Sequence, residues 1–136
     1  MTAEINKKKV MAFGTFDIFH KGHENYLRQA KRLGGQMIVV IARDKTVKLV
    51  KGKLPKQSEN VRLKRVRESG LADKVILGNI SDKYAVIRKQ KPDIIALGYD
   101  QKNFIDSLAK TFPKIKIVRL KSFKPSIYKS SKIIKK

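Results

Sequence analysis

Residues 14–23 read GTFDIFHKGH, and the rest of the chain is organised around this stretch. A short apolar run at residues 10–13 precedes it and is typical of a buried β-strand. After it, apolar side chains recur at helical spacing over residues 26–33. The stretch is therefore predicted to form the loop and first helical turn between a strand and a helix.

The residue types in this turn favour a phosphate site. N–H groups at a helix start lack intrahelical partners, and the helix dipole adds positive potential there. Gly14 allows a sharp turn, and Gly22 allows a ligand to approach the backbone. His20 and His23 are expected on one side of the helix, where they can donate hydrogen bonds to a phosphate. Taken singly, each histidine also fits a surface or capping position, and Asp17 fits a turn or an N-cap.

Length and composition indicate one soluble domain, residues 1–136, with a hydrophobic core. The absence of cysteine excludes disulfides and thiolate metal sites and favours a reducing compartment. No apolar run is long enough to span a membrane, and the N-terminus lacks the apolar region of a signal peptide. We therefore expect a cytoplasmic protein with no membrane partner.

The formal net charge is +22, from 33 Lys and Arg against 11 Asp and Glu. Such an excess suggests a polyanionic partner. The cations are spread along the chain without an aromatic platform for bases, so we expect them to form a solvated surface and to line a site for polyanionic substrates. A basic nucleic-acid-binding module is the alternative from another class, and it would bind nucleic acid in a salt-sensitive way without catalysis.

Strands and helices are predicted to alternate along the chain. The expected strands are residues 8–13, 37–42, 74–77, 93–97 and 114–120, and the expected helices are residues 21–33, 58–69, 81–90, 103–112 and 130–135. Ser58 and Ser81 are the predicted N-caps of two of these helices, whereas Gly52 and Pro55 argue against regular structure in residues 43–57. The pattern predicts an α/β, Rossmann-like, open parallel five-stranded sheet with helices on both faces.

Ligands of such sheets bind beyond the carboxyl ends of the strands, where the strand order reverses. Residues 14–23 follow the first predicted strand, residues 43–44 follow the second, and residues 98–100 follow the fourth, so all three segments are expected to face one crevice. The chain has no phosphate-binding G-x-x-x-x-G-K-[ST] loop, no G-x-G-x-x-G after the first strand and no clustered zinc ligands.

Every fixed position of residues 14–23 matches the G-T-F-D-x-x-H-x-G-H signature, and the stretch resembles the cytidylyltransferase-like nucleotidyltransferases. Residues 41–44 and 71–75 are similar to further segments of that family, and residues 130–134 are similar to its closing I-S-T-[ST]-x-I-I motif. The resemblance implies nucleotidyl transfer and a homodimer. Mg²⁺ or another divalent cation is expected to enter with the nucleotide, because it commonly binds through substrate phosphates.

The expected site residues follow from the crevice and this resemblance. The nucleotide-binding residues are expected to be Thr15, Phe16, Asp17, His20, Lys21, Gly22, His23, Arg62, Asp100, Tyr128, Ser130 and Ser131. The catalytic residues are expected to be His20, His23 and Lys51, and the acceptor-binding residues Asp44 and Lys53.

Several of these positions also have ordinary explanations. Lys48, Lys51 and Lys53 could close over the phosphates or simply belong to a solvated loop. Arg62 fits a surface position or a cap, and Asp100 fits a turn.

Two branches of the family compete for the substrate. Residues 42–47, 51–55, 91–101 and 128–131 resemble the archaeal-type FAD synthases, which transfer AMP from ATP to FMN and release pyrophosphate. Glycerol-3-phosphate cytidylyltransferases, which use CTP, are similar in size. They carry an arginine before the last helix that is missing here or replaced by Lys124. We therefore expect ATP and FMN as substrates, with CTP and a phospho-alcohol as the alternative.

Overall fold

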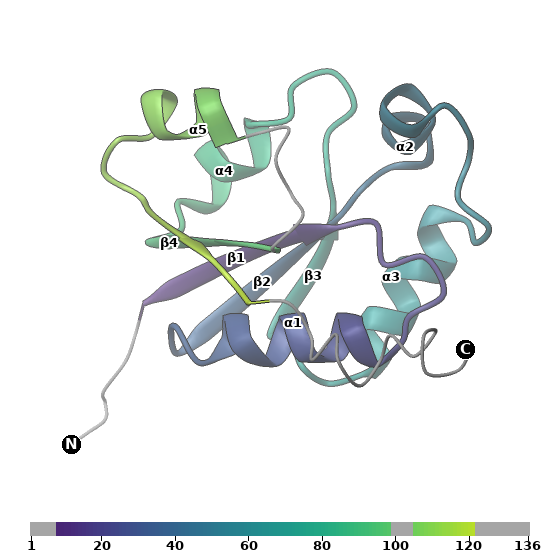
Figure 1. Cartoon of the computed structure of the whole chain (residues 1–136), viewed down its shortest axis with the longest axis horizontal. Coiled ribbons are helices and arrows are strands. Elements are labelled where there is room, and N and C mark those ends of the chain that lie inside the picture. The colour runs from purple at the N-terminus through teal and green to yellow at the C-terminus, as the bar shows by residue number, and fades with distance from the viewer. Residues whose placement is uncertain (1–7, 99–104, 122–136) are drawn as a thin grey trace, which may run out of the picture.

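A parallel five-stranded sheet in the order β3-β2-β1-β4-β5 forms the centre of the protein, as predicted (Figure 1). The computed structural model describes residues 8–98 and 105–121. The strands are β1 (Lys9–Gly14), β2 (Gln36–Ile41), β3 (Lys74–Leu77), β4 (Ile94–Leu97) and β5 (Lys116–Arg119). The helices are α1 (Lys21–Lys31), α2 (Asp44–Lys51), α3 (Glu59–Glu68), α4 (Ala85–Gln90) and α5 (Ile105–Thr111).

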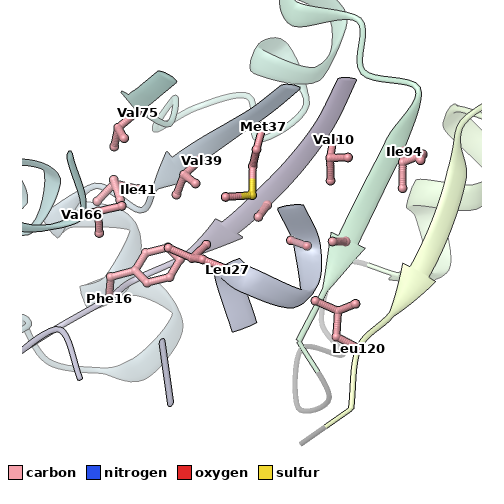
Figure 2. Close-up of a cluster of buried hydrophobic side chains, with 13 residues drawn as sticks. Val10, Phe16, Leu27, Met37, Val39, Ile41, Val66, Val75, Ile94 and Leu120 are labelled. Carbon is pink, nitrogen blue, oxygen red and sulfur yellow. The ribbon is translucent and has the colours of Figure 1, made fainter. Parts of the chain in front are cut away.

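Helices cover both faces of the sheet because successive residues of a strand point to opposite sides. On one face, Val10 and Ala12 of β1 pack with Leu27 of α1 and Val66 of α3 (Figure 2). On the other face, Met11 packs in a second cluster with side chains of α4 and α5. The central strands are therefore buried from both sides, as their continuous apolar sequence indicates.

The segment after β2 is helical, and the expectation that residues 43–57 lack regular structure is wrong. α2 begins with Asp44, whose charge is favourable near a helix N-terminus, and it buries Val47. Gly52 ends the helix in the left-handed conformation at φ 83°. Gly52 and Pro55 therefore mark the stop of a short helix rather than its absence.

The remaining boundaries follow the predictions, with one further correction. Ser58 is the N-cap of α3, and its hydroxyl accepts a hydrogen bond from the N–H of Val61. Ser81 does not cap α4, which begins at Ala85, because Asp82 forms a turn by accepting a hydrogen bond from the N–H of Tyr84. The predicted helix at residues 130–135 lies outside the described residues.

The strand order reverses between β1 and β4. The chain leaves β1 towards β2 on one side and returns through β3 and α4 to β4 on the other. The carboxyl ends of these strands define the edge at which ligands of such sheets bind. Within the described residues, no helix is long and apolar enough to cross a membrane.

A tight backbone contact at Gly34 offers a test of the packing between α1 and β1. A Cβ atom at Gly34 would lie 2.6 Å from the carbonyl oxygen of Lys8 and 2.6 Å from a Val10 methyl group. We expect Gly34→Ala to lower the free energy of unfolding by about 2–3 kcal/mol, because neither neighbour can move freely.

The matched control is Gly70→Ala, where φ is +72° and nothing lies within 4 Å of the added carbon. In that control the free energy of unfolding falls only by the cost of a left-handed backbone at alanine, about 1 kcal/mol. Urea unfolding of the two variants measures the difference. A Gly34→Ala loss no larger than that of the control would contradict the packing argument.

Candidate active site

The loop between β1 and α1 is held in an uncommon backbone conformation. Phe16 and Ile18 have φ values of 54° and 51°, in the left-handed region that non-glycine residues rarely adopt. The ring of Phe16 is buried and lies against Gly14, where a Cβ atom would come within 2.7 Å of it. Gly14 is therefore required by close packing, and the surrounding contacts must hold the loop in its strained form.

Asp17 supplies one of those contacts. Its carboxylate accepts hydrogen bonds from the N–H groups of Lys56 and Gln57, at 2.8 and 2.9 Å. The N–H of Ile18 donates to the side-chain oxygen of Gln57 at 3.2 Å. Burial opposes ionisation of Asp17, yet these backbone hydrogen bonds and the charge of Arg62 hold the pKa of its carboxyl below the ordinary value. The carboxylate thus fastens the loop to the segment before α3.

The two histidines cap α1 reciprocally. His20 is the N-cap, and its Nδ1 accepts a hydrogen bond from the N–H of Gly22 at 3.0 Å. The Nδ1 of His23 accepts one from the N–H of His20 at 3.2 Å, and the two rings stack with centroids 3.8 Å apart. Since each Nδ1 is an acceptor, a neutral ring carries its proton on Nε2. The Nε2–H groups are then the donors that the pair can offer to a ligand.

His23 is enclosed by aromatic rings. Phe16 meets it edge-on at 5.3 Å between centroids, and Phe19 stacks on it at 5.6 Å. Burial, reinforced by the neighbouring charges of His20 and Lys51, lowers the pKa of His23 to about 4, although the Asp17 carboxylate opposes the shift. His23 is therefore a neutral hydrogen-bond donor at physiological pH rather than a cation.

Arg62 is fully buried, and its guanidinium joins three segments at the carboxyl edge of the sheet. Its Nε donates to the carbonyl of Gln57 at 2.9 Å, and one terminal nitrogen donates to the carbonyls of Thr15 and Ala42 at 2.9 and 2.8 Å. The other terminal nitrogen pairs with Asp44 at 2.6 Å. The explanation of Arg62 as a surface residue is therefore wrong, because it lies at the centre of the loop framework.

The N-terminal end of α2 is fixed by a second arginine. Arg43 donates to the carbonyl of Gly78 at 2.9 Å and pairs with Glu59 at 3.2 Å. The other carboxylate oxygen of Glu59 accepts a hydrogen bond from the N–H of Asp44 at 2.8 Å. The end of β2 is thereby tied to α3 and to the end of β3.

Sequence reasoning missed two residues that build this region. Tyr26 belongs to the apolar pattern of α1, yet its hydroxyl accepts a hydrogen bond from the N–H of Phe13 at 3.2 Å and can donate to the carbonyl of Ala96 at 2.9 Å, near the carboxyl ends of β1 and β4. Its ring also stacks on Phe16 at 6.1 Å. Glu59 is not among the predicted site residues, yet its carboxylate holds Arg43 and the N–H of Asp44. A tyrosine among the aliphatic residues on the apolar face of α1 is the one sequence signal that could have indicated the role of Tyr26.

The structure brings most of the predicted residues to one edge. Thr15, Phe16, Asp17, His20, Lys21, Gly22 and His23 lie in the loop and first turn of α1, Asp44 and Lys51 lie on α2, and Lys53 follows Gly52. Lys48 and Lys51 are on a helix rather than in an irregular loop. Asp100, Tyr128, Ser130 and Ser131 lie outside the described residues.

This arrangement suits the binding of a polyphosphate. Two imidazole donors stand at the positive end of α1, and the ammonium of Lys51 is close enough to affect the pKa of His23. Donors fixed before the reaction stabilise charge that develops on phosphate oxygens. Within the described residues, no group of three or more His, Asp or Glu side chains could hold a metal ion.

Comparison with known proteins places these features in a family. The family model described as cytidylyltransferase-like matches residues 11–136. An FAD synthase of Thermoplasma volcanium is 42% identical over 132 residues, covering 94% of this chain and 92% of the relative. An FAD synthase of Methanothermus fervidus is 44% identical over 134 residues, covering 93% of this chain and 92% of the relative.

Solved structures agree with the fold. A structure titled as the lipopolysaccharide core biosynthesis protein from Thermoplasma volcanium matches with a TM-score of 0.79 at 42% identity, covering 85% of this chain and 98% of that chain. A pantoate-beta-alanine ligase from Francisella tularensis matches with a TM-score of 0.61 at 18% identity, covering 92% of this chain and 63% of that chain. The second likeness concerns the fold alone.

The buried guanidinium gives a stability prediction. We expect Arg62→Met to lower the free energy of unfolding by about 3–5 kcal/mol, because it leaves a charged carboxylate at Asp44 and two strand-end carbonyls without their donor. Arg65→Met on the exposed part of the same helix is the matched control and should change stability by less than about 0.5 kcal/mol. Chemical unfolding compares them, and equal effects would show that Arg62 does not hold the loops.

The environment of His23 predicts a pH dependence. Proton NMR of the folded protein should show a histidine titrating near pH 4, and that resonance should vanish in His23→Gln, since the chain has two histidines. Unfolded His23 binds a proton near pH 6.5, whereas the folded form does so only near pH 4. The free energy of unfolding should therefore fall as the pH drops through this window. A His23 midpoint near 6.5 would contradict the enclosure.

Proposed function

The chain belongs to the cytidylyltransferase-like family, and on that premise we propose that it is an FMN adenylyltransferase, which transfers AMP from ATP to FMN. The products are FAD and pyrophosphate. The reciprocal capping of α1 by His20 and His23 is the observation that carries the proposal, because it directs two Nε2–H donors from a helix N-terminus. The FAD synthases that cover more than nine-tenths of this chain support FMN as the acceptor.

The chemistry needs positioning and charge stabilisation. A phosphate oxygen of FMN attacks the α-phosphorus of ATP, a new P–O bond forms, and the bond to the β-phosphate oxygen breaks as pyrophosphate leaves with the electron pair. The attacking phosphate is already ionised at neutral pH, so no general base is required. The site's task is therefore to hold the two phosphates in line and to neutralise the charge around the phosphorus.

Each part of the site has a proposed role in that step. His20 and His23 donate hydrogen bonds to the α-phosphate and leaving-group oxygens, and these bonds strengthen as charge develops. Lys51 brings a positive charge to the same phosphates. Lys53 and Asp44 are the proposed contacts to the acceptor, and Arg62, which is buried, would act on the nucleotide through the Thr15 carbonyl and the loop that it positions.

Mg²⁺ enters the proposal as part of the ATP substrate. It commonly keeps several waters and binds through substrate phosphates, and in the described residues no cluster of acidic or histidine side chains competes for it. Asp100, Tyr128, Ser130 and Ser131 remain predicted nucleotide contacts. A homodimer and a cytoplasmic location likewise remain predictions from the sequence.

An activity assay tests this function with its alternative included. The purified protein is incubated with MgATP or MgCTP and with FMN or glycerol 3-phosphate, and the products are separated. FAD and pyrophosphate are expected from ATP and FMN. CDP-glycerol from CTP, with no FAD, would replace the proposed substrates by those of the cytidylyltransferase branch.

Two variants test the histidines without removing the caps. Asn at position 20 can still accept the N–H of Gly22, and Gln at position 23 can still accept the N–H of residue 20. We expect His20→Asn and His23→Gln each to lower kcat by about 10²–10⁴-fold while the unfolding midpoint stays near that of the wild type. Near-normal turnover in both would remove the imidazoles from the mechanism.

A further inference from the structure

The large hydrophobic side chains that are well exposed gather at the carboxyl edge of the sheet. Within the described residues they are Ile18, Leu49, Val50, Leu54, Val61 and Ile80, in segments that follow β1, β2 and β3 or in the first turn of α3. Three of them fall within a six-residue stretch, where Leu49 is 77%, Val50 61% and Leu54 58% exposed. This stretch, residues 49–54, forms the end of α2 and the turn after Gly52.

The stability of the fold does not require the apolar side chains of residues 49–54 to be exposed. α2 is anchored at its start by Arg43 and Asp44 and along its inner face by Val47, which is 5% exposed. Leu49 and Val50, on the same helix, remain largely exposed. Because burying a leucine or valine is worth about 1.5–3 kcal/mol, their exposure leaves an apolar surface available to a ligand.

The charges around the stretch restrict what can cover it. Lysines stand at positions 45, 48, 51, 53 and 56, and among the described residues no carboxylate lies within ion-pair distance of their ammonium groups. A second copy of this chain would bring like charges together across the same surface. An anion with a large apolar body fits both features.

The stretch also leads into the catalytic loop. Lys51 affects the pKa of His23, and the segment after Leu54 is hydrogen-bonded through Lys56 and Gln57 to Asp17. Figure 1 shows the chain that follows α2 running beside the loop between β1 and α1. A ligand whose phosphate lies between the histidines and Lys51 can therefore extend its other end over residues 49–54.

We propose that Leu49, Val50 and Leu54 form the seat of the isoalloxazine ring of the flavin acceptor, with the surrounding lysines attracting its phosphate. This inference rests on the proposed function, since it names the acceptor subsite of the same reaction. On this proposal the histidines act on the ATP phosphates, whereas the exposed apolar stretch at residues 49–54 selects the acceptor. Phospho-alcohols without a ring gain nothing from that stretch.

The test combines kinetics with binding. The variant Leu49→Gln/Val50→Thr/Leu54→Gln keeps side-chain size and removes the apolar surface, and Val61→Thr on α3 is the matched control. We expect the triple variant to raise the KM for FMN by about tenfold or more, while its kcat and its KM for ATP change by less than about twofold. Val61→Thr should leave all three constants unchanged. An unchanged KM for FMN in the triple variant overturns the seat.

Riboflavin, which has the ring and no phosphate, probes the seat without turnover. Its fluorescence should change on binding to the wild type and to Val61→Thr, and the change should be lost in the triple variant. If that pattern holds but the wild type forms no FAD, the proposed reaction fails and the flavin seat stands. If the wild type forms FAD and the triple variant binds riboflavin as tightly as the wild type does, the proposed flavin seat is wrong and the proposed reaction stands. Sedimentation that shows a wild-type dimer dissociating in the triple variant, with unchanged flavin affinity, would assign the surface to a second copy and overturn the proposal.

Discussion

The guanidinium of Arg62 is the interaction on which the arrangement of the site depends. Parallel strands leave carbonyl groups unpaired at their carboxyl ends, and here the oxygens of Thr15 and Ala42, just beyond β1 and β2, both accept from this one side chain. Burying a charge is costly, and the paired carboxylate of Asp44 offsets only part of that cost. The hydrogen bonds from Arg62 to backbone carbonyl groups offset the remaining cost of burying the charge, and they form only in this arrangement of the loops. Arg62 therefore fixes the positions of the loops, and its removal is costly because Asp44 and the carbonyl groups then lose their donor.

That fixed framework explains how the loop after β1 can remain strained. Left-handed backbone at Phe16 and Ile18 persists because the ring of Phe16 is locked against Gly14 and because Asp17 is fastened to the segment before α3. The strain has a structural effect that bears on the site. It places an aromatic ring against His23, whose burial keeps that imidazole neutral. An uncharged donor can strengthen its bond as charge grows in the reaction without first attracting a counter-ion.

The sequence predicted the sheet and the histidine turn because both depend on local pattern. Continuous β-branched runs such as β2 specify a buried parallel strand, and the spacing of His20 and His23 places the rings together without further information. Arg62 and Tyr26 could not be read in the same way, because most of their partners are backbone groups of distant segments that only the tertiary fold brings near. α2 was missed for a different reason. Its length is marginal for helix periodicity, and its stop signals, Gly52 and Pro55, are equally typical of an irregular segment.

The high net charge of the chain affects what can bind to the exposed apolar stretch at residues 49–54. An exposed aliphatic surface favours self-association, because contact between two copies of the chain would bury that surface. A net charge of +22 opposes that contact, most strongly where lysines surround the stretch itself. The same positive field attracts phosphorylated ligands, because their negative charge is favourable in it. The lysines around residues 49–54 therefore oppose contact with a second copy at this surface and are compatible with the proposed binding of an anionic substrate there.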